Sequence, residues 1–307
     1  MRPFMHLPFK TFILSAAGVS LAACATISSD EQKTPDPEIV KAEEWRTVKP
    51  DNLLIIAVEA GQIIIELNED FAPKHTKQIR ELSAKGIYDG ETFYRVIDGF
   101  VAQGGLKDDE RIAPFGKLAN ENDRPIKTDG SDKFVPLGNG DLFAETVGHV
   151  DGFAAAKDAK LGREWLLHCP GAIAMARDED PDSGSTEFYI VLDAQRYLDR
   201  NLTVFGRVLS GMELVQAFKR GDRDIESGVI QAPAKGETIL KMRTAADIPE
   251  AERPTWQVMN TNAPAFEEFK TAKRVRNEAF FYRKPPEVLD ICSFSVPARK
   301  TLETADR

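Results

Sequence analysis

Residues 93–105 read FYRVIDGFVAQGG, and the fold assignment starts from this stretch. Aromatic and β-branched residues recur over residues 92–97 and 100–103, so we expect two strands here. Taken one at a time the residues are ordinary, because Arg95 suits the solvent face of a strand, Phe100 a core position and the closing glycine pair a simple turn. The stretch becomes informative only together with the segments around it.

Strand signals continue on both sides of this stretch. Upstream, residues 53–58 and 62–67 are expected to form a hairpin, because Gly61 between them can adopt the positive φ of a tight turn. Downstream, further β-rich runs lie at residues 171–176, 187–192, 203–209 and 238–243. The pattern is that of a mainly β protein.

Two helices are expected among these strands. The first follows Asp70, has Pro73 near its first turn and ends at Gly86, and the second begins at Gly211 and ends at Gly221. Many short antiparallel strands with two helices favour a closed barrel that is capped at its ends.

Several ordered motifs carry a family resemblance. Residues 93–105 resemble the most distinctive motif of the cyclophilins, the barrel-shaped peptidyl-prolyl cis-trans isomerases. Segments similar to the rest of that family follow its order, at residues 70–74, 86–92, 175–190, 197–200 and 204–208. The resemblance covers roughly residues 52–245 and implies a closed, eight-stranded antiparallel barrel capped by two helices. The overall layout resembles an envelope subgroup of bacterial cyclophilins.

The resemblance also implies a cofactor-free reaction. Rotation about a peptide bond has a barrier of ~18–20 kcal/mol because the nitrogen lone pair is delocalised into the carbonyl. A catalyst that favours the twisted state, in which nitrogen regains its lone pair, needs no covalent step. Arg95 matches the family's catalytic arginine, whose guanidinium would donate to the prolyl nitrogen and the neighbouring carbonyl. Gln103 matches the residue that steadies this arginine and binds the substrate backbone.

Other matched positions bind the substrate in the family. Ala176 and Arg177 match the stretch whose main chain pairs with the peptide. The positions that line or border the proline pocket are Phe100, Val101, Tyr189, Tyr197, Leu198 and Leu202.

Some of these positions depart from the family pattern. Tyr189 stands where phenylalanine is usual, Tyr197 where tryptophan or phenylalanine is usual, Leu202 where many members have histidine, and Val101 where methionine is usual. Glu187 replaces glutamine, and we hypothesise that it holds Arg95 in an ion pair that competes with the substrate. Losing one transition-state hydrogen bond costs ~1–3 kcal/mol, so we expect turnover at a reduced rate.

The N-terminus has the features of an export signal. Arg2 and Lys10 precede an uncharged apolar stretch, residues 11–23, which is too short to span a bilayer comfortably. It ends in Leu-Ala-Ala before Cys24, which resembles the bacterial lipoprotein signal whose cysteine receives a lipid. The alternative is an ordinary secretory signal, residues 1–23, with a chance cysteine after it.

Residues 24–50 are polar and contain three prolines, so we expect a flexible tether. The protein is then expected to be held by its lipid on the periplasmic side of the cell envelope. Ala25 after the lipidated cysteine favours the outer membrane over the inner one.

The remaining chain divides into a cyclophilin-like domain, residues 51–247, and a C-terminal extension, residues 248–307. The domain carries an insertion at residues 106–170, too long for an ordinary connection and therefore functional or partly mobile. In the extension, one apolar helical face over residues 266–279 is expected to pack on the barrel, and residues 290–296 suit an added strand or an extended covering segment.

Three cysteines are present, and lipidation of Cys24 leaves Cys169 and Cys292 as a pair in a compartment that permits disulfides. A disulfide between them and two separate buried thiols are equally compatible with the sequence.

Composition excludes some functions. A formal net charge of −9, a pI near 5.2 and the lack of a basic block argue against a nucleic-acid partner. The histidines outside the signal, His75, His149 and His168, form no ligand pattern, so no metal site is expected.

The sequence therefore indicates a cofactor-free isomerase that acts on proline bonds of unfolded or flexible exported proteins. Two alternatives remain. One is a catalytically weak proline-binding module or holdase, which the altered pocket positions suggest. The other is a tethered interaction protein that recruits an envelope partner through residues 106–170 and the C-terminal extension.

Overall fold

A computed structural model describes residues 41–301 of the chain. The expected signal peptide, Cys24 and the first part of the expected tether lie outside these residues. Within residues 41–301, no helix is both long enough and apolar enough to cross a membrane.

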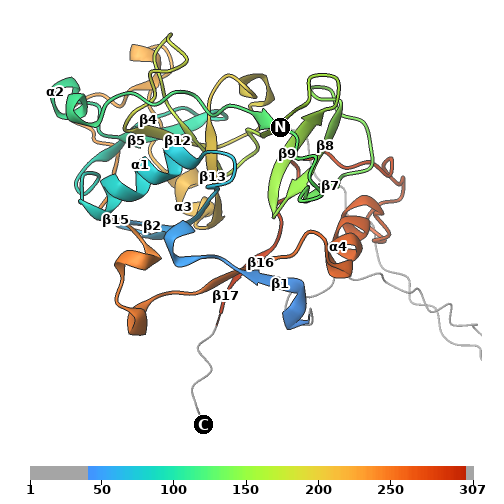
Figure 1. The fold of residues 1–307 in the computed structure, drawn as a ribbon. Coiled ribbons are helices and arrows are strands. Elements are labelled where there is room, and N and C mark those ends of the chain that lie inside the picture. The colour runs from blue at the N-terminus through green and yellow to red at the C-terminus, as the bar shows by residue number, and fades with distance from the viewer. Residues whose placement is uncertain (1–40, 302–307) are drawn as a thin grey trace, which may run out of the picture. The chain divides into compact units, whose positions relative to one another are not determined.

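The largest element is an antiparallel sheet of nine strands, in the order β14-β4-β5-β12-β11-β13-β3-β2-β15 (Figure 1). The strands are β2 (Leu53–Val58), β3 (Gly61–Leu67), β4 (Thr92–Val96), β5 (Val101–Gly105), β11 (Ala172–Met175), β12 (Glu187–Val191), β13 (Val204–Ser210), β14 (Glu237–Thr238) and β15 (Lys241–Thr244). The expected hairpin is present, because β2 pairs with β3 through a turn at Gly61.

The expected closed ring of eight strands is corrected to a curled sheet of nine. Its two edge strands, β14 and β15, are consecutive along the chain, so the two edges of the sheet come together. Ile239, fully buried between them, donates its N–H to Glu91 O, and Leu240 donates to Ala57 O. The strand expected over residues 238–243 is therefore split at this point.

The two expected helices, α1 (Pro73–Ala84) and α3 (Met212–Ala217), close the main core. Ile79 and Leu82 of α1 and Val215 of α3 are buried against the inner face of the sheet. Strand side chains alternate between faces, so Phe188 of β12 enters this core while Tyr189 points to the outer face.

The insertion, which was expected to be functional or partly mobile, forms a sheet of its own. After α2 (Asp109–Ile112), five strands pair in the order β6-β10-β9-β8-β7. They are β6 (Arg124–Pro125), β7 (Phe134–Pro136), β8 (Thr146–Val150), β9 (Phe153–Asp158) and β10 (Arg163–Leu166). Apolar residues of this sheet, Phe153 and Leu166 among them, are buried in one cluster with Tyr189 and Val101.

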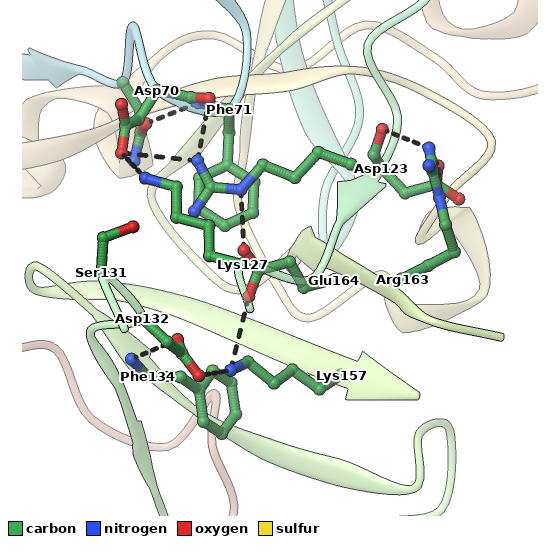
Figure 2. A network of polar contacts seen from close by, with 12 residues as sticks. Asp70, Phe71, Asp123, Lys127, Ser131, Asp132, Phe134, Lys157, Arg163 and Glu164 are labelled. Atoms are coloured by element: carbon green, nitrogen blue, oxygen red, sulfur yellow. Dashed lines mark hydrogen bonds and ion pairs between the residues drawn. The ribbon is translucent and has the colours of Figure 1, made fainter. Parts of the chain in front are cut away.

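Polar contacts join the insertion to the loop before α1 (Figure 2). The Arg124 Nε donates to the Glu164 carboxylate at 2.8 Å and its Nη1 to Asp70 O at 2.9 Å, while the guanidinium carbon lies 3.5 Å from the centre of the Phe71 ring. Only 1% of the Glu164 side chain is exposed, and Lys157 Nζ lies 3.7 Å from its other oxygen. A buried carboxylate thus has cations on both sides.

The terminal segments form a third sheet, in the order β1-β16-β17. Its strands are β1 (Trp45–Thr47), β16 (Trp256–Met259) and β17 (Ala298–Lys300). The prediction of a tether extending to residue 50 was wrong for residues 41–50, because Trp45 and Val48 are buried, at 6% and 3% exposure. The free energy gained by burying these apolar side chains outweighs the tendency of a polar segment to remain unpacked.

The C-terminal extension packs on the sheet as expected, but its helix is shorter than predicted, because it ends at Arg274 and Ala279 is exposed. Helix α4 (Pro264–Arg274) buries Phe266 in a cluster with Leu53 and Ile55 of β2. Residues 290–296 form the covering segment and not a strand, with Ile291 buried. Figure 1 shows α4 close to the insertion, and Arg274 donates to Leu137 O there at 2.6 Å.

Cys169 and Cys292 are joined by a disulfide, with Cα atoms 4.8 Å apart. Of the two alternatives that the sequence left open, the structure has the bonded one. The bond links the end of the insertion to the C-terminal extension within an apolar cluster that includes Trp165 and Leu289.

Candidate active site

Strand pairing places three predicted site residues side by side on the outer face of the large sheet. Arg95 of β4 lies opposite Gln103 of β5, and Gln103 lies opposite Tyr189 of β12. Directly opposed residues share a face, so these side chains form one row. The sheet has therefore brought together residues that are far apart in the sequence.

The Arg95 guanidinium is held at two of its three nitrogens. Its Nη1 donates to Gln103 Oε1 at 2.9 Å, and its Nε donates to the carbonyl of Ser227 at 2.8 Å. Within residues 41–301, Nη2 has no hydrogen-bond partner. The guanidinium carbon lies 5.8 Å from the centre of the Phe100 ring. A fixed donor thus points into the space beside an apolar ring.

Ser227 is a site residue that the sequence did not indicate. Ser227 and Glu226 both adopt positive φ, 54° and 45°, which is uncommon for residues with a side chain. Val229, two residues further along the chain, forms an antiparallel bridge with Arg95. The loop therefore turns the Ser227 carbonyl toward Arg95, a result of tertiary packing that no local pattern signals.

The Gln103 amide connects Arg95 to a second polar pair. Its Nε2 donates to the Tyr94 hydroxyl at 2.6 Å and lies 3.5 Å from Glu187 Oε2, while the Tyr94 hydroxyl donates to Glu187 Oε1 at 2.8 Å. An irregularity in the β4–β5 pairing between Thr92 and Arg95 allows neighbouring side chains to reach the same amide. Tyr94 was missed because strict alternation would turn it to the opposite face.

Glu187 does not pair with Arg95 as hypothesised. Its carboxylate accepts from Tyr94 and Gln103, and among the ion pairs of residues 41–301 none joins it to Arg95. Burial raises the pKa of the Glu187 carboxyl, which outweighs the hydrogen bonds from Tyr94 and Gln103 that favour its charged form. Burial likewise raises the pKa of the Tyr94 hydroxyl.

The hydroxyl of Tyr189 is turned toward a buried histidine. It lies 3.0 Å from His168 Nε2, and His168 Nδ1 lies 3.1 Å from the Asp199 carboxylate. Asp199 also accepts from Arg196 Nε at 2.6 Å. His168 is fully buried, and burial raises the pKa of the Tyr189 hydroxyl. The chain Asp199–His168–Tyr189 fixes the ring by its hydroxyl end, and sequence reasoning had given His168 no role.

The other predicted pocket residues lie around this row. Tyr189 shares its apolar cluster with Phe100, Val101, Ala176 and Leu202. Tyr197 is 62% exposed and lines, with Arg95 and Phe100, a hollow of about 450 Å³. Leu198 lies next to Tyr197 in a short 3₁₀ turn and is half-buried. It belongs neither to the apolar cluster of Tyr189 nor to the residues that line the hollow.

Ala176 and Arg177 border a second hollow of about 450 Å³ on the other side of Gln103. The Ala176 N–H is already used, because it donates to Glu187 O at 2.9 Å. The Arg177 side chain donates to Asn201 O, and its own N–H has no hydrogen bond within the described part of the chain. Of these two residues, Arg177 is therefore the one whose main-chain N–H is free to bind a peptide.

The arrangement can bind a peptide without an added group. A fixed cationic donor and an apolar ring border one hollow, and the residue with the unpaired main-chain N–H borders a second hollow that Gln103 also lines. Nowhere in residues 41–301 do three histidine, cysteine or carboxylate side chains cluster as metal ligands.

Comparison with known proteins agrees across sequence and structure. Residues 53–244 match the family model described as cyclophilin type peptidyl-prolyl cis-trans isomerase/CLD. A probable peptidyl-prolyl cis-trans isomerase of Brucella suis biovar 1 (strain 1330) is 31% identical over 198 residues, which cover 64% of this chain and 85% of that protein. Peptidyl-prolyl cis-trans isomerase B of Bacillus subtilis (strain 168) is 30% identical over 164 residues, covering 53% and 87%.

Among solved structures, the cyclophilin AquaCyp293 from Hirschia baltica is similar with a TM-score of 0.67 and 26% sequence identity. The alignment covers 84% of this chain and 94% of that one. The similarity therefore extends beyond residues 53–244, which the family model matches, into the terminal segments.

Proposed function

Because this chain belongs to the cyclophilin family of peptidyl-prolyl cis-trans isomerases, we propose that Arg95 is the residue that accelerates rotation about the prolyl bond. The observation that carries the proposal is the guanidinium itself, fixed by Gln103 and Ser227 with Nη2 unpaired beside Phe100.

The chemistry requires a donor aimed at the twisted amide. As the C–N bond rotates, the prolyl nitrogen becomes pyramidal and regains an accepting lone pair. A donor that is already oriented stabilises this state without reorganising during the reaction. Arg95 Nη2 donates to that nitrogen, the apolar wall of Phe100, Val101 and Tyr189 holds the proline ring, and no proton or covalent bond is exchanged.

We propose that the clients are proline-containing, unfolded or flexible exported proteins. The apolar stretch before Cys24 and the Cys169–Cys292 disulfide support an oxidising compartment outside the cytoplasm. We also propose that a lipid on Cys24 holds the protein at the periplasmic face of the outer membrane. Mass spectrometry of the mature N-terminus tests the anchor, and a Cys24→Ser variant that stays in the membrane fraction argues against it.

A proline-limited refolding reaction tests the role of Arg95. We expect wild-type protein to accelerate it and Arg95→Ala to lower kcat/KM by about 10²–10³-fold, the usual cost of removing one such donor. Arg95→Lys keeps the charge but loses the planar fork, so it restores little activity. Arg283→Ala, which removes an exposed arginine of the C-terminal extension, serves as the matched control. Equal rates for wild type and Arg95→Ala would rule out this assignment.

A further inference from the structure

The hollow beside Arg95 has one lining residue in common with a larger hollow. Tyr197, which borders the 450 Å³ hollow, also lines a groove of about 740 Å³ whose other lining residues come from the insertion and from residues 196–201. We call this the insertion groove, and its insertion residues include Leu142, Phe143, Glu145 and Asp158. Because Tyr197 lines both hollows, an extended ligand that lies across Tyr197 can reach both.

Large apolar side chains are exposed at the edge of the insertion groove. Leu142 is 96% exposed and Phe143 is 57% exposed. Adjacent exposed apolar residues of this size are typical of binding surfaces, because burying them in a partner removes apolar area from water.

The loop that carries these residues is anchored. The Asp141 carboxylate accepts from the N–H groups of Phe143 and Ala144 at 2.9 and 3.0 Å. Both Asp141 oxygens also accept from Arg196, each at 3.0 Å, and the Phe143 ring lies 5.2 Å from the Arg196 guanidinium carbon. The apolar side chains are thus held open beside Tyr197 before any ligand arrives.

The groove also carries negative charge. Arg196 is paired with both Asp141 and Asp199, and Arg200 shares the Asp123 carboxylate with Arg163. Within the described residues, Glu145 and Asp158 form no ion pair. An apolar side chain followed by a basic one complements this surface.

We propose that the insertion groove is a second subsite for the client polypeptide, which binds an apolar side chain a few residues from the proline held beside Arg95. The proposal rests on the proposed function. The geometry favours a segment of the client as the occupant, because Tyr197 borders both hollows. An extended chain advances ~3.3 Å per residue, so a residue a few positions from the proline can reach the insertion groove.

Matched peptides test the subsite. Each has the same Ala-Pro centre and carries either Leu-Lys or Ser-Lys three to five residues away, with one series on each side of the proline. We expect wild-type protein to isomerise the leucine peptides of one series with a kcat/KM about fivefold higher. The double variant Leu142→Ser/Phe143→Ser lowers that ratio to about one, while Phe280→Ser/Tyr282→Ser, equally exposed but in the C-terminal extension, keeps it.

The outcomes separate the subsite from the catalytic proposal. Equal rates for both peptides with wild-type protein, or an unchanged ratio in the Leu142→Ser/Phe143→Ser variant, would overturn the subsite and leave the function of Arg95 intact. Tighter binding of the leucine peptide without any acceleration supports the subsite and contradicts only the catalytic proposal. If instead the double variant abolishes a dimer seen by sedimentation and the peptides show no preference, a second copy occupies the groove and the subsite is overturned.

Discussion

The rim around Arg95 and the insertion behind it are stabilised in different ways. At the rim, Arg95, Gln103 and Tyr94 are half-buried, come from adjacent paired strands and touch through hydrogen bonds. The insertion instead depends on buried charges such as Glu164, which Arg124 and Lys157 neutralise, and it ends at a disulfide. The rim is positioned by pairing within the large sheet, whereas the sheet of the insertion is joined to the loop before α1 and to the C-terminal extension by side-chain contacts and the disulfide.

The difference implies that the two regions respond to different perturbations. Changes at the rim alter the reaction while the backbone ladder keeps the strands in register. Changes in the insertion remove stability, because an unpaired buried charge or an open chain loop has a large cost in free energy.

The largest effect is expected from Cys169→Ser/Cys292→Ser. The bond closes a loop with a sequence separation of 123 residues, so its loss lowers the free energy of unfolding by about 4–5 kcal/mol on the chain-entropy account. Denaturant unfolding measures this change. Isomerase activity below the unfolding transition should survive, since Arg95 and Gln103 are held by strand pairing. Loss of activity in the still-folded variant would contradict the conclusion that the rim keeps its geometry without the disulfide.

Glu164→Gln should have the next largest effect on stability. Breaking a buried ion pair leaves Arg124, with only 14% of its side chain exposed, paired only with the largely exposed Asp70 carboxylate at 3.4 Å, at a cost of about 3–5 kcal/mol. The matched control is Glu81→Gln, which removes the exposed Lys77–Glu81 pair and should cost about 0.5 kcal/mol or less. If both variants lose a similar amount of stability in thermal unfolding, the conclusion that Glu164 stabilises the insertion as a buried charge is wrong.

Tyr189→Phe probes the place where the two regions meet. The ring stays and the hydroxyl is lost, so His168 Nε2 loses its partner and stability falls by about 1–2 kcal/mol. Because the hydroxyl faces His168, kcat/KM for proline peptides should change by less than about threefold. A drop in rate of tenfold or more with unchanged stability would show that the hydroxyl acts on the substrate.

The smallest effect is a pH dependence of opposite sign in the two regions. At the rim, burial raises the pKa of the Glu187 carboxyl above its ordinary 4.5. The contribution of Glu187 to the free energy of unfolding is therefore present at lower pH and is lost as pH rises through the folded-state pKa. In the insertion, burial opposes ionisation of Asp141, but Arg196 outweighs it and holds the pKa below 3.8. That contribution is present above pH 3.8 and is lost as pH falls through the folded-state value.

Melting temperatures between pH 3 and pH 7 measure both slopes. Glu187→Gln should flatten the curve above about pH 4.5, and Asp141→Asn should flatten it below about pH 4. The comparison is of slopes and not of absolute stability, because Asp141→Asn also weakens the contact to Arg196. If the melting temperature depends on pH in the same way in wild type and Glu187→Gln, the pKa of the Glu187 carboxyl is not raised in the folded protein.

The sequence predicted the rim well because its residues belong to one contiguous stretch with a fixed strand register. Arg95, Gln103 and Phe100 therefore meet as expected, whereas Ser227 and His168 reach the site only through tertiary contacts. The split between β14 and β15 escaped prediction because residues 238–243 read as one continuous strand.

The insertion was the least predictable region, although one signal was present. Asp151 and Gly152, with φ of 48° and 89°, join β8 to β9, and an Asp-Gly pair between β-rich runs is a strong hairpin signal. The paired charges could not be predicted, because nothing local links Arg124 to Glu164. The buried Trp45 and Val48 similarly lie in a cluster that includes residues of distant segments, such as Val258 and Phe266.

The Cys169–Cys292 bond has a consequence for the order of events during biosynthesis. Translation runs from the N-terminus, so the thiol of Cys169 exists before the residues that lead to its partner, 123 positions further along, have been made. Those residues include β12 to β15, the last strands of the large sheet. Every strand of that sheet is thus available for pairing before the crosslink becomes possible, and the bond secures an arrangement that the nascent chain has already had the opportunity to reach.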